Sequence, residues 1–366
     1  MRHPIRPGRP IVVKVGSSSL TGGAGGLDLG RLDAVVDQVA AAWDAGHPTV
    51  LVTSGAIAAG LPVLGLTRRP TDVPGLQVAA AVGQGHLMHA YASAFSARGR
   101  TVGQVLLTRD VLATREQYVH SSAALERMLE RGVVPIVNEN DVVIVDELRF
   151  GDNDRLAAIV SHLVGASLLV LLTDTEGIFD EDPRVNGNAA LMAAVLHSDE
   201  ALDRVARAAE GGTFGSGGMA TKVAAARMAA WSGIPTVVAP AGRADAVAAA
   251  LAGEEVGTWV APRPSSLPAR KLWIAFGLPV AGRLLVDDGA VGALVDGGKS
   301  LLAVGVVGVD GSFDAGQAVE VVDGAGDPVA KGRVRLGSDQ VRAIAGSRVD
   351  DGVVIHRDDL VVLVDA

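Results

Sequence analysis

Short apolar runs without alternation are the feature that most constrains the fold of this chain. Four of them are followed by glycine or polar residues: 11–15, 49–53, 133–137 and 168–172. Such runs are typical of strands buried on both faces, as in a parallel sheet covered by helices. The sequence therefore predicts an α/β fold, a three-layer αβα sandwich around a mainly parallel sheet.

Further elements fit this plan. Apolar residues at helical spacing predict helices over 28–45, 76–98, 116–130 and 219–231. Additional strands are predicted over 102–107, 236–238 and 256–260, and a hairpin strand over 142–145.

The pattern changes near the C-terminus. Residues 261–268 are rich in proline and serine, which indicates a linker. From about residue 281, short valine-rich strands alternate with Asp-Gly turns and helical patterns nearly vanish. We therefore expect a catalytic domain over 1–262, a linker over 263–280 and a small, mostly β barrel over 281–366.

Composition excludes several classes of protein. The net charge of −9 argues against nucleic acid as the main partner. The absence of cysteine rules out disulfides and thiolate metal sites. Residues 1–10 are basic but lack the apolar segment of a secretory signal, and no apolar run of about 18 residues predicts a membrane span. We expect a cytoplasmic enzyme.

Polar residues recur where predicted strands end, namely at Ser54-Gly55, at 138–141 and at Thr173-Asp174. One such cluster is usually a loop with helix caps. Three of them at the same edge of a parallel sheet favour a binding site, because parallel topology brings these strand ends together.

Lys14 lies within the apolar run 11–15, where burying a lysine is costly unless an anion pairs with it. One interpretation is that the side chain reaches solvent from the strand end. The alternative, which we favour, is that Lys14 holds a phosphate at the carboxyl end of the first strand.

The segment 215–222 is a second candidate for phosphate binding. Its glycines allow close backbone approach, and the helix predicted from Met219 offers free N–H groups, with Lys222 about one turn inside. The alternative to phosphate binding is a flexible loop followed by a solvated lysine. The segment is not a Walker A loop, because no glycine directly precedes Lys222.

Two lysines and two glycine-rich turns suit phosphoryl transfer, which needs positioning and charge neutralisation more than covalent help. A carboxylate between the lysines would orient both, and Asp154 is the candidate. The simpler role of Asp152 and Asp154 is to cap the following helix. His86 and His89 lack a third ligand nearby in sequence and predict no metal site.

Together these motifs resemble the glutamate 5-kinases of the amino-acid kinase family over nearly the whole chain. The residues that carry the resemblance are 14–18, 52–57, 137–141, 150–154, 172–174 and 217–222. The C-terminal region resembles a PUA domain, a barrel that many bacterial members of this family carry.

The resemblance implies ATP-dependent phosphorylation of the L-glutamate γ-carboxylate, the first step of proline synthesis. It assigns catalysis to Lys14, Asp154 and Lys222, with Mg²⁺ carried on the nucleotide phosphates. It also implies inhibition by proline and assembly into a dimer or tetramer. The residues implied for glutamate are Ser54, Gly55, Asn138, Asp141, Asp152 and Asn153; those for ATP are Lys14, Thr173, Asp174, Ser216, Gly217, Gly218, Met219, Ala220, Thr221 and Lys222.

Two alternatives stay open. A sister kinase of the same family would act on acetylglutamate, aspartate, carbamate or UMP, although Asp141 suits an acceptor with a free ammonium group. An RNA-binding role is the other, because PUA domains in other proteins bind RNA. Residues 281–366 hold 8 Lys and Arg against 14 Asp and Glu, which repels a phosphate backbone.

Overall fold

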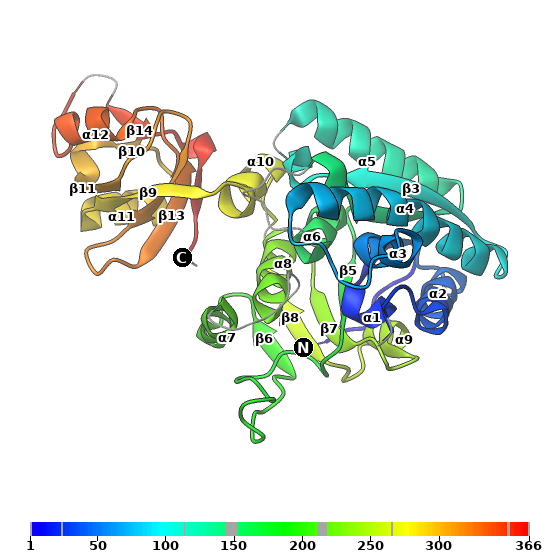
Figure 1. The fold of residues 1–366 in the computed structure, drawn as a ribbon. Helices are drawn as coiled ribbons and strands as arrows, with labels where there is room; N and C mark the ends of the chain where they lie inside the picture. The colour runs from blue at the N-terminus through cyan, green and yellow to red at the C-terminus, as the bar shows by residue number, and fades with distance from the viewer. Residues whose placement is uncertain are drawn as a thin grey trace. The chain divides into compact units, whose positions relative to one another are not determined.

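The computed structural model describes residues 2–22, 25–112, 114–143, 153–210, 218–264, 266–349 and 352–364. The chain divides into two compact units, Met1–Ser266 and Leu267–Ala366 (Figure 1). The boundary falls within the linker expected over 263–280. That stretch also contains two short helical segments, α10 (Ala269–Leu272) and η3 (Trp273–Gly277).

A mainly parallel sheet of eight strands organises the described part of the first unit, as predicted. Its strand order is β3-β4-β2-β1-β5-β7-β8-β6, and each neighbouring pair is parallel except β7 and β8. The strands are β1 (Ile11–Val15), β2 (Thr49–Val52), β3 (Thr101–Leu107), β4 (Val133–Glu139), β5 (Leu168–Thr173), β6 (Ala194–Leu196), β7 (Thr236–Pro240) and β8 (Thr258–Ala261).

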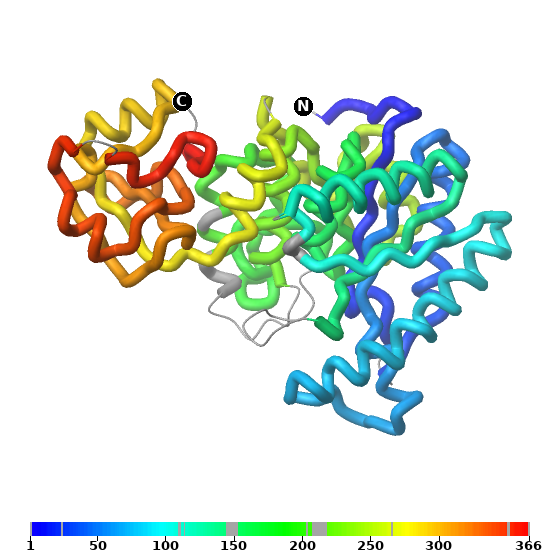
Figure 2. The backbone as a smooth tube through the Cα atoms, turned by 90° about the horizontal axis from the view of Figure 1, so that it is seen from above, coloured from blue at the N-terminus to red at the C-terminus, as the bar shows by residue number. Residues whose placement is uncertain are grey.

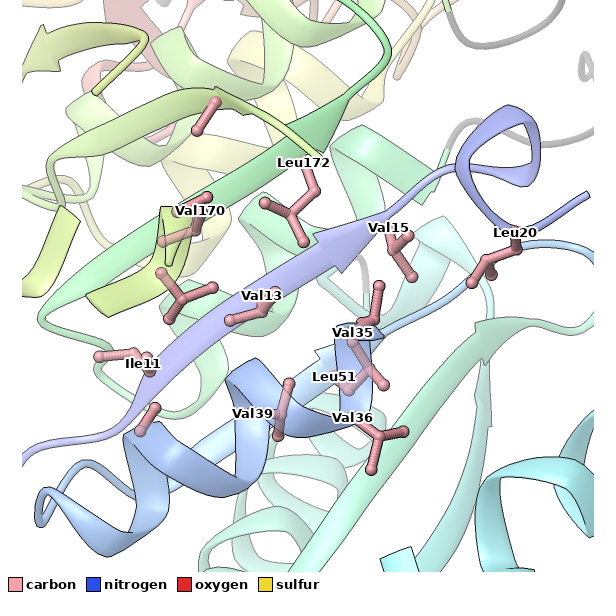
Figure 3. Close-up of a cluster of buried hydrophobic side chains, with 14 of the residues drawn as sticks. Ile11, Val13, Val15, Leu20, Val35, Val36, Val39, Leu51, Val170 and Leu172 are labelled. Atoms are coloured by element: carbon pink, nitrogen blue, oxygen red, sulfur yellow. The ribbon is translucent and has the colours of Figure 1, made fainter. Parts of the chain in front are cut away.

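Two sets of helices cover this sheet. The first is α2 (Leu29–Asp44), α4 (Val73–Ser96) and α9 (Ala246–Ala252); the second is α5 (Arg115–Glu130), α6 (Asn153–Leu163) and α8 (Met219–Trp231). Alternate residues of β1 pack with Val35 and Val39 of α2 (Figure 3), while α6 contacts the same strand. All five β1 residues are therefore buried, which explains why the run shows no alternation.

The polar turn after β4 forms a short helical turn, η2 (Asp141–Val143). The hairpin strand predicted over 142–145 is therefore wrong at 142–143, and 144–145 lie outside the described residues. Val143 N–H donates to Asn140 O at 3.2 Å, and Gln77 Nε2 of α4 donates to Val142 O at 3.1 Å. Turn and tertiary hydrogen bonds thus override the strand preference of consecutive valines.

The shorter helical segments of the first unit are α1 (Ser17–Leu20), α3 (Ala56–Val63), η1 (Arg109–Leu112) and α7 (Glu200–Glu210). Helices α3 and α4 lie side by side in Figures 1 and 2. Their backbones touch at two glycines. A Cβ built on Gly83 would stand 1.8 Å from Ala56 O, and one on Gly60 would stand 2.0 Å from Ala79 O. This contact fixes the position of the first turn of α3.

Gly83→Ala is expected to lower the free energy of unfolding by about 3 kcal/mol, because backbone atoms cannot rotate away from the added methyl group. Chemical denaturation at neutral pH measures the change. Gly85→Ala is the matched control, since nothing lies within 4 Å of a Cβ at that position of the same helix. A control as destabilised as Gly83→Ala would show that helix packing is not the cause.

The N-terminal residues are held against the first unit. The guanidinium group of Arg2 donates hydrogen bonds of 2.6–2.8 Å to the carbonyl oxygens of Ala193, Glu254, Val256 and Gly257. Ile5 N–H donates to Leu251 O at 2.8 Å. The family motifs gave no role to residues 1–10, and these contacts assign them a structural one.

The second unit is mostly β. Its main sheet has the strand order β11-β9-β12-β13-β15, and β10 pairs with β14. The strands are β9 (Val280–Val286), β10 (Leu301–Leu302), β11 (Val306–Gly311), β12 (Ala318–Val322), β13 (Pro328–Arg333), β14 (Val353–Ile355) and β15 (Leu360–Val362), and the short helical turns are η4 (Ala303–Gly305) and η5 (Arg357–Asp359).

Two helices of this unit were not expected, α11 (Asp288–Val295) and α12 (Ser338–Ile344). At α11, the pattern Asp287-Asp288-Gly289 had predicted a turn. Instead, the Asp287 carboxylate accepts from Ala290 N–H at 2.7 Å and caps the helix. Aspartate is common both in turns and at helix N-caps, so this motif alone does not distinguish a turn from the start of a helix. Among the described residues, no helix is both long and apolar enough to cross a membrane.

Candidate active site

A cleft of about 680 Å³ opens at the carboxyl edge of the parallel sheet. Its lining comes from the ends of β1, β2, β4 and β5 and from the first turns of α3, α6 and α8. This is the edge at which open α/β sheets bind their ligands. The three polar clusters predicted to converge do so, since Ser54, Asn138 and Thr173 all line the cleft.

Two lysines meet on one carboxylate at the base of this cleft. Lys14 Nζ on β1 lies 2.6 Å from Asp154 Oδ1, and Lys222 Nζ on α8 lies 3.3 Å from Asp154 Oδ2. The side chains of Lys14, Lys222 and Asp154 are 3%, 7% and 1% exposed. Asp154 therefore pairs with both lysines. Neither lysine side chain extends freely into solvent, which was the alternative interpretation for each.

The charges in this cluster depend on one another. Burial raises the pKa of Asp154, but the attraction of Lys14 and Lys222 outweighs it and lowers that pKa to about 2. Burial lowers the pKa of Lys222, and Asp154 opposes this effect. The carboxylate is therefore ionised at neutral pH and stabilises the positive charge of Lys222.

Thr221 adds a hydrogen bond that the sequence did not indicate. Its hydroxyl donates to Asp154 Oδ2 at 2.7 Å. This residue immediately precedes Lys222 in α8, which begins after Gly218 without a side-chain cap. The first turn of α8 thus fixes the carboxylate and also leaves its N-terminus available to a ligand in the cleft.

A separate polar network begins at the neighbouring residue of α6. Asn153 Nδ2 donates to Ser54 Oγ at 2.9 Å and to Asn138 Oδ1 at 3.0 Å. Asn138 Nδ2 in turn donates to Gln84 Oε1 at 2.9 Å. The network links α6, the end of β2, the end of β4 and α4 beside the lysine cluster.

The turn between β2 and α3 depends on Gly55, whose φ of +101° lies in the left-handed region. Glycine adopts this conformation at no steric cost. The turn points the first residues of α3 at the cleft, where Gly55, Ala56 and Ile57 form part of the lining. The α3 N-terminus is therefore a further place for a negative group.

Asp141 is the second carboxylate of interest in the cleft. Burial raises its pKa to about 6, although the positive charge of Arg69 opposes the shift. Arg69 also lines the cleft, from the loop between α3 and α4. At neutral pH Asp141 is mostly ionised and able to pair with a cation.

Sequence comparison identifies the family of this first unit. The model of the amino acid kinase family matches residues 9–240, which is more than half of the chain.

The chain belongs to the amino acid kinase family.

A second model, the PUA domain, matches residues 282–356 of this amino acid kinase.

Relatives of this amino acid kinase align over the full length. It is 48% identical to the glutamate 5-kinase of Rhodococcus opacus, with 99% of each chain covered. The glutamate 5-kinase of Frankia casuarinae is also 48% identical, with 100% of each covered. Among solved structures, the UMP kinase of Bacillus anthracis aligns with 72% of this chain and 99% of its own, at 13% identity and a TM-score of 0.49. The family assignment rests on the sequence matches.

Most site residues predicted for this amino acid kinase lie together. Those that line the cleft are Lys14, Ser54, Gly55, Asn138, Asp141, Asn153, Thr173, Asp174, Gly218, Met219 and Lys222. Asp154 is buried behind the two lysines, and Thr221 contacts it. Ala220 is in the first turn of α8 but is not part of the lining. Asp152, Ser216 and Gly217 lie outside the described residues.

Two charged parts of the lining were not predicted as site residues. One is the segment 179–184, which lines the cleft of the kinase together with Val205. The other is Arg69. Neither belongs to a strand-end motif, so strand spacing carried no signal for them. The sequence signal that could have indicated an ordered loop is a proline next to a charged residue, as at Pro70 and Pro183.

Proposed function

We infer that this chain is a glutamate 5-kinase, which transfers the γ-phosphoryl group of ATP to the γ-carboxylate of L-glutamate. The product, L-glutamyl 5-phosphate, is the first intermediate of proline biosynthesis from glutamate. Full-length similarity to glutamate 5-kinases at 48% identity supports this function. The observation that carries the mechanism is the pair of buried lysines, Lys14 and Lys222, on the single carboxylate of Asp154.

The reaction needs no general base, because the acceptor is already a carboxylate. One γ-carboxylate oxygen forms a bond to the γ-phosphorus of ATP as the bond to the bridging oxygen breaks, and ADP leaves with that electron pair. Negative charge is spread over the transferring group and the leaving oxygen. We propose that Lys14 stabilises this charge from the acceptor side and Lys222 from the nucleotide side.

We propose that Asp154 acts by positioning these lysines. Its two oxygens hold one ammonium group each, at 2.6 Å and 3.3 Å, so that both cations face the same region of the cleft. Without it, two like charges buried close together would repel one another. A carboxylate so engaged keeps the cluster charged before the phosphate arrives, which limits reorganisation during the reaction.

We propose that different residues of the cleft recognise the two substrates. We propose that Ser54, Gly55, Asn138, Asp141, Asp152 and Asn153 bind glutamate, with Asp141 pairing with its ammonium group. Family membership implies ATP as the phosphoryl donor. For ATP we propose Lys14, Thr173, Asp174 and the segment 216–222, where glycines and the α8 N-terminus suit phosphates.

Magnesium would travel on the nucleotide phosphates and supply charge neutralisation there. Among the described residues, no group of three or more histidine and acidic side chains is arranged to hold a metal ion. Asp154 is occupied by two ammonium groups and a hydroxyl, which leaves it unsuited as a metal ligand. Phosphate oxygens are the ligands that Mg²⁺ commonly uses in such sites.

We also propose that proline inhibits the enzyme, that it assembles as a dimer or tetramer, and that catalysis resides in 1–262, ahead of a linker (263–280) and the PUA domain (281–366). The resemblance to glutamate 5-kinases supports the first two. The match of the two family models to 9–240 and 282–356 supports the third.

A direct assay of acceptors tests the function. Purified protein is incubated with ATP, Mg²⁺ and L-glutamate, N-acetylglutamate, aspartate, carbamate or UMP in turn, and ADP release is measured. Acyl phosphate is trapped with hydroxylamine for the amino acids. We expect turnover with L-glutamate at least tenfold above any other acceptor. Turnover with UMP or N-acetylglutamate but not with L-glutamate would assign the chain to a sister kinase.

Glutamate binding is expected to weaken as the pH falls through 6. The pKa of Asp141 is raised to about 6, so below that pH the carboxyl is protonated and loses its attraction for the glutamate ammonium group. The KM for glutamate should then rise several-fold between pH 7 and pH 5.5, with the KM for ATP much less affected. Asp141→Asn should have a high KM at both values. A wild-type KM that stays constant over this range would contradict the role.

A further inference from the structure

Arg69 is a cation of the cleft that the mechanism leaves without a role. It lies between α3 and α4 and lines the same cleft as Ser54, Asn138 and Asp141. Its sequence neighbour Arg68 does not line the cleft. Both side chains are exposed and share a loop, but only Arg69 lines the cleft, so Arg68 serves as a matched control.

Among the described residues that line the cleft, the other cations already have carboxylate partners within the protein. Lys14 and Lys222 pair with Asp154, and the guanidinium group of Arg184 pairs with Asp182 at 3.0 Å. For Arg69, by contrast, no carboxylate of the described residues lies within ion-pair distance. Its positive charge lowers the pKa of Asp141, against the effect of burial. A planar guanidinium in this position is available to a carboxylate ligand.

A positive group at this end of the cleft matches the chemistry of the acceptor. Glutamate carries a carboxylate at each end, and the γ-carboxylate must face Lys14 and Lys222 to react. The α-carboxylate and the α-ammonium group then lie at the other end of the molecule and need partners of opposite charge. Asp141 offers the negative partner, and Arg69, which acts electrostatically on Asp141, offers the positive one.

The loop that carries Arg69 is fixed at both ends. On one side, α3 is packed against α4 through Gly60 and Gly83. On the other, the Asp72 carboxylate accepts from Gly75 N–H at 2.9 Å and caps α4. Pro70 follows Arg69 directly and restricts its backbone to extended conformations. The arginine is therefore presented from a restrained loop, which reduces the entropy lost on binding.

We propose that Arg69 binds the α-carboxylate of the amino acid acceptor, beside Asp141, which takes the α-ammonium group. This role rests on the proposed function of the cleft as a glutamate 5-kinase site. The pair recognises an acceptor that carries both charged groups on one carbon. Arg69 alone does not separate glutamate from N-acetylglutamate, since both keep the α-carboxylate, and that choice falls to Asp141.

Steady-state kinetics of the full-length protein tests the proposal. Arg69→Gln should raise the KM for glutamate about tenfold or more, because a charge-assisted bidentate contact is lost. Its kcat should stay within about threefold of wild type and its KM for ATP unchanged, since the lysine cluster is intact. Arg69→Lys should recover part of the affinity. Arg68→Gln, the matched control from the same loop, should match wild type within about twofold.

A second measurement separates direct contact from an effect through Asp141. At pH 8 Asp141 is ionised in wild type and in the variant, so only the direct contact still distinguishes them. A KM for glutamate that remains raised in Arg69→Gln at pH 8 supports the contact. The proposed contact is overturned if the KM of Arg69→Gln for glutamate returns to the wild-type value at pH 8. It is also overturned if this KM is within twofold of wild type at pH 7. Failure of wild type to phosphorylate glutamate would instead refute the proposed function.

Discussion

Lys222→Ala is expected to leave a folded protein whose kcat for glutamate phosphorylation falls about 10³-fold. The lost ammonium group would otherwise stabilise charge that develops on the transferring phosphoryl group, and a preorganised donor of this kind has an effect of that size. The fold should persist, because Asp154 keeps Lys14 at 2.6 Å. Burial already lowers the pKa of Lys222, so removing this side chain also removes a desolvation cost.

Initial rates at saturating glutamate and ATP measure this effect, and thermal denaturation checks the fold. Lys299→Ala is the control, since Lys299 is exposed and belongs to the second unit. It should retain wild-type activity. A Lys222→Ala enzyme within threefold of the wild-type kcat would show that Lys222 has no role in stabilising the transition state.

Asp154→Asn is expected to lower the free energy of unfolding by about 3 kcal/mol at neutral pH and to abolish most activity. The substitution keeps the shape of the side chain but removes the negative charge between Lys14 and Lys222. Breaking a buried ion pair by removing one partner is costly, because the remaining charge stays buried without compensation. Here two ammonium groups are affected at once.

The difference in stability between wild type and Asp154→Asn is expected to depend on pH. The pKa of Asp154 is about 2 in the folded protein, below the value near 3.9 of an unfolded aspartate. The contribution of the Asp154 charge to the free energy of unfolding is therefore complete above about pH 4, and it is lost as the pH falls through 2. Urea denaturation at pH 7 and pH 3 should show the gap between wild type and Asp154→Asn narrowing at the lower pH.

Asp245→Asn is a suitable control for this series. Asp245 pairs with Arg243 at 2.7 Å, but this pair is exposed on the surface of the first unit. Its substitution should leave the denaturation midpoint nearly unchanged at both pH values. An Asp154→Asn protein as stable as this control would mean that the lysine cluster contributes nothing to folding.

Much of the first unit follows from its sequence, for a physical reason. Strands buried on both faces have to be apolar throughout, so β1, β2, β4 and β5 are visible as uninterrupted runs. A parallel sheet then places their carboxyl ends at one edge. This topology brings Lys14 and Lys222 together although they are far apart in the chain, and Asp154 was predicted between them from its residue type and its neighbours.

What could not be predicted depends on contacts between distant segments. Arg69 and the segment 179–184 line the cleft from loops, and neither loop has a periodic pattern that would predict this. At 142–143, hydrogen bonds from α4 and from the preceding turn select a helical turn for two valines. The helix α11 begins at an Asp-Asp-Gly motif that also forms turns, so only the structure distinguishes the two.

Asn153 and Asp154 are consecutive residues at the start of α6, and they join different networks. Asn153 bonds to Ser54 and Asn138, while Asp154 holds the two lysines. A helix turns by about 100° per residue, so any rotation of α6 that improved one network would disrupt the other. We therefore expect any substitution that shifts α6 to disturb the polar network and the lysine cluster together.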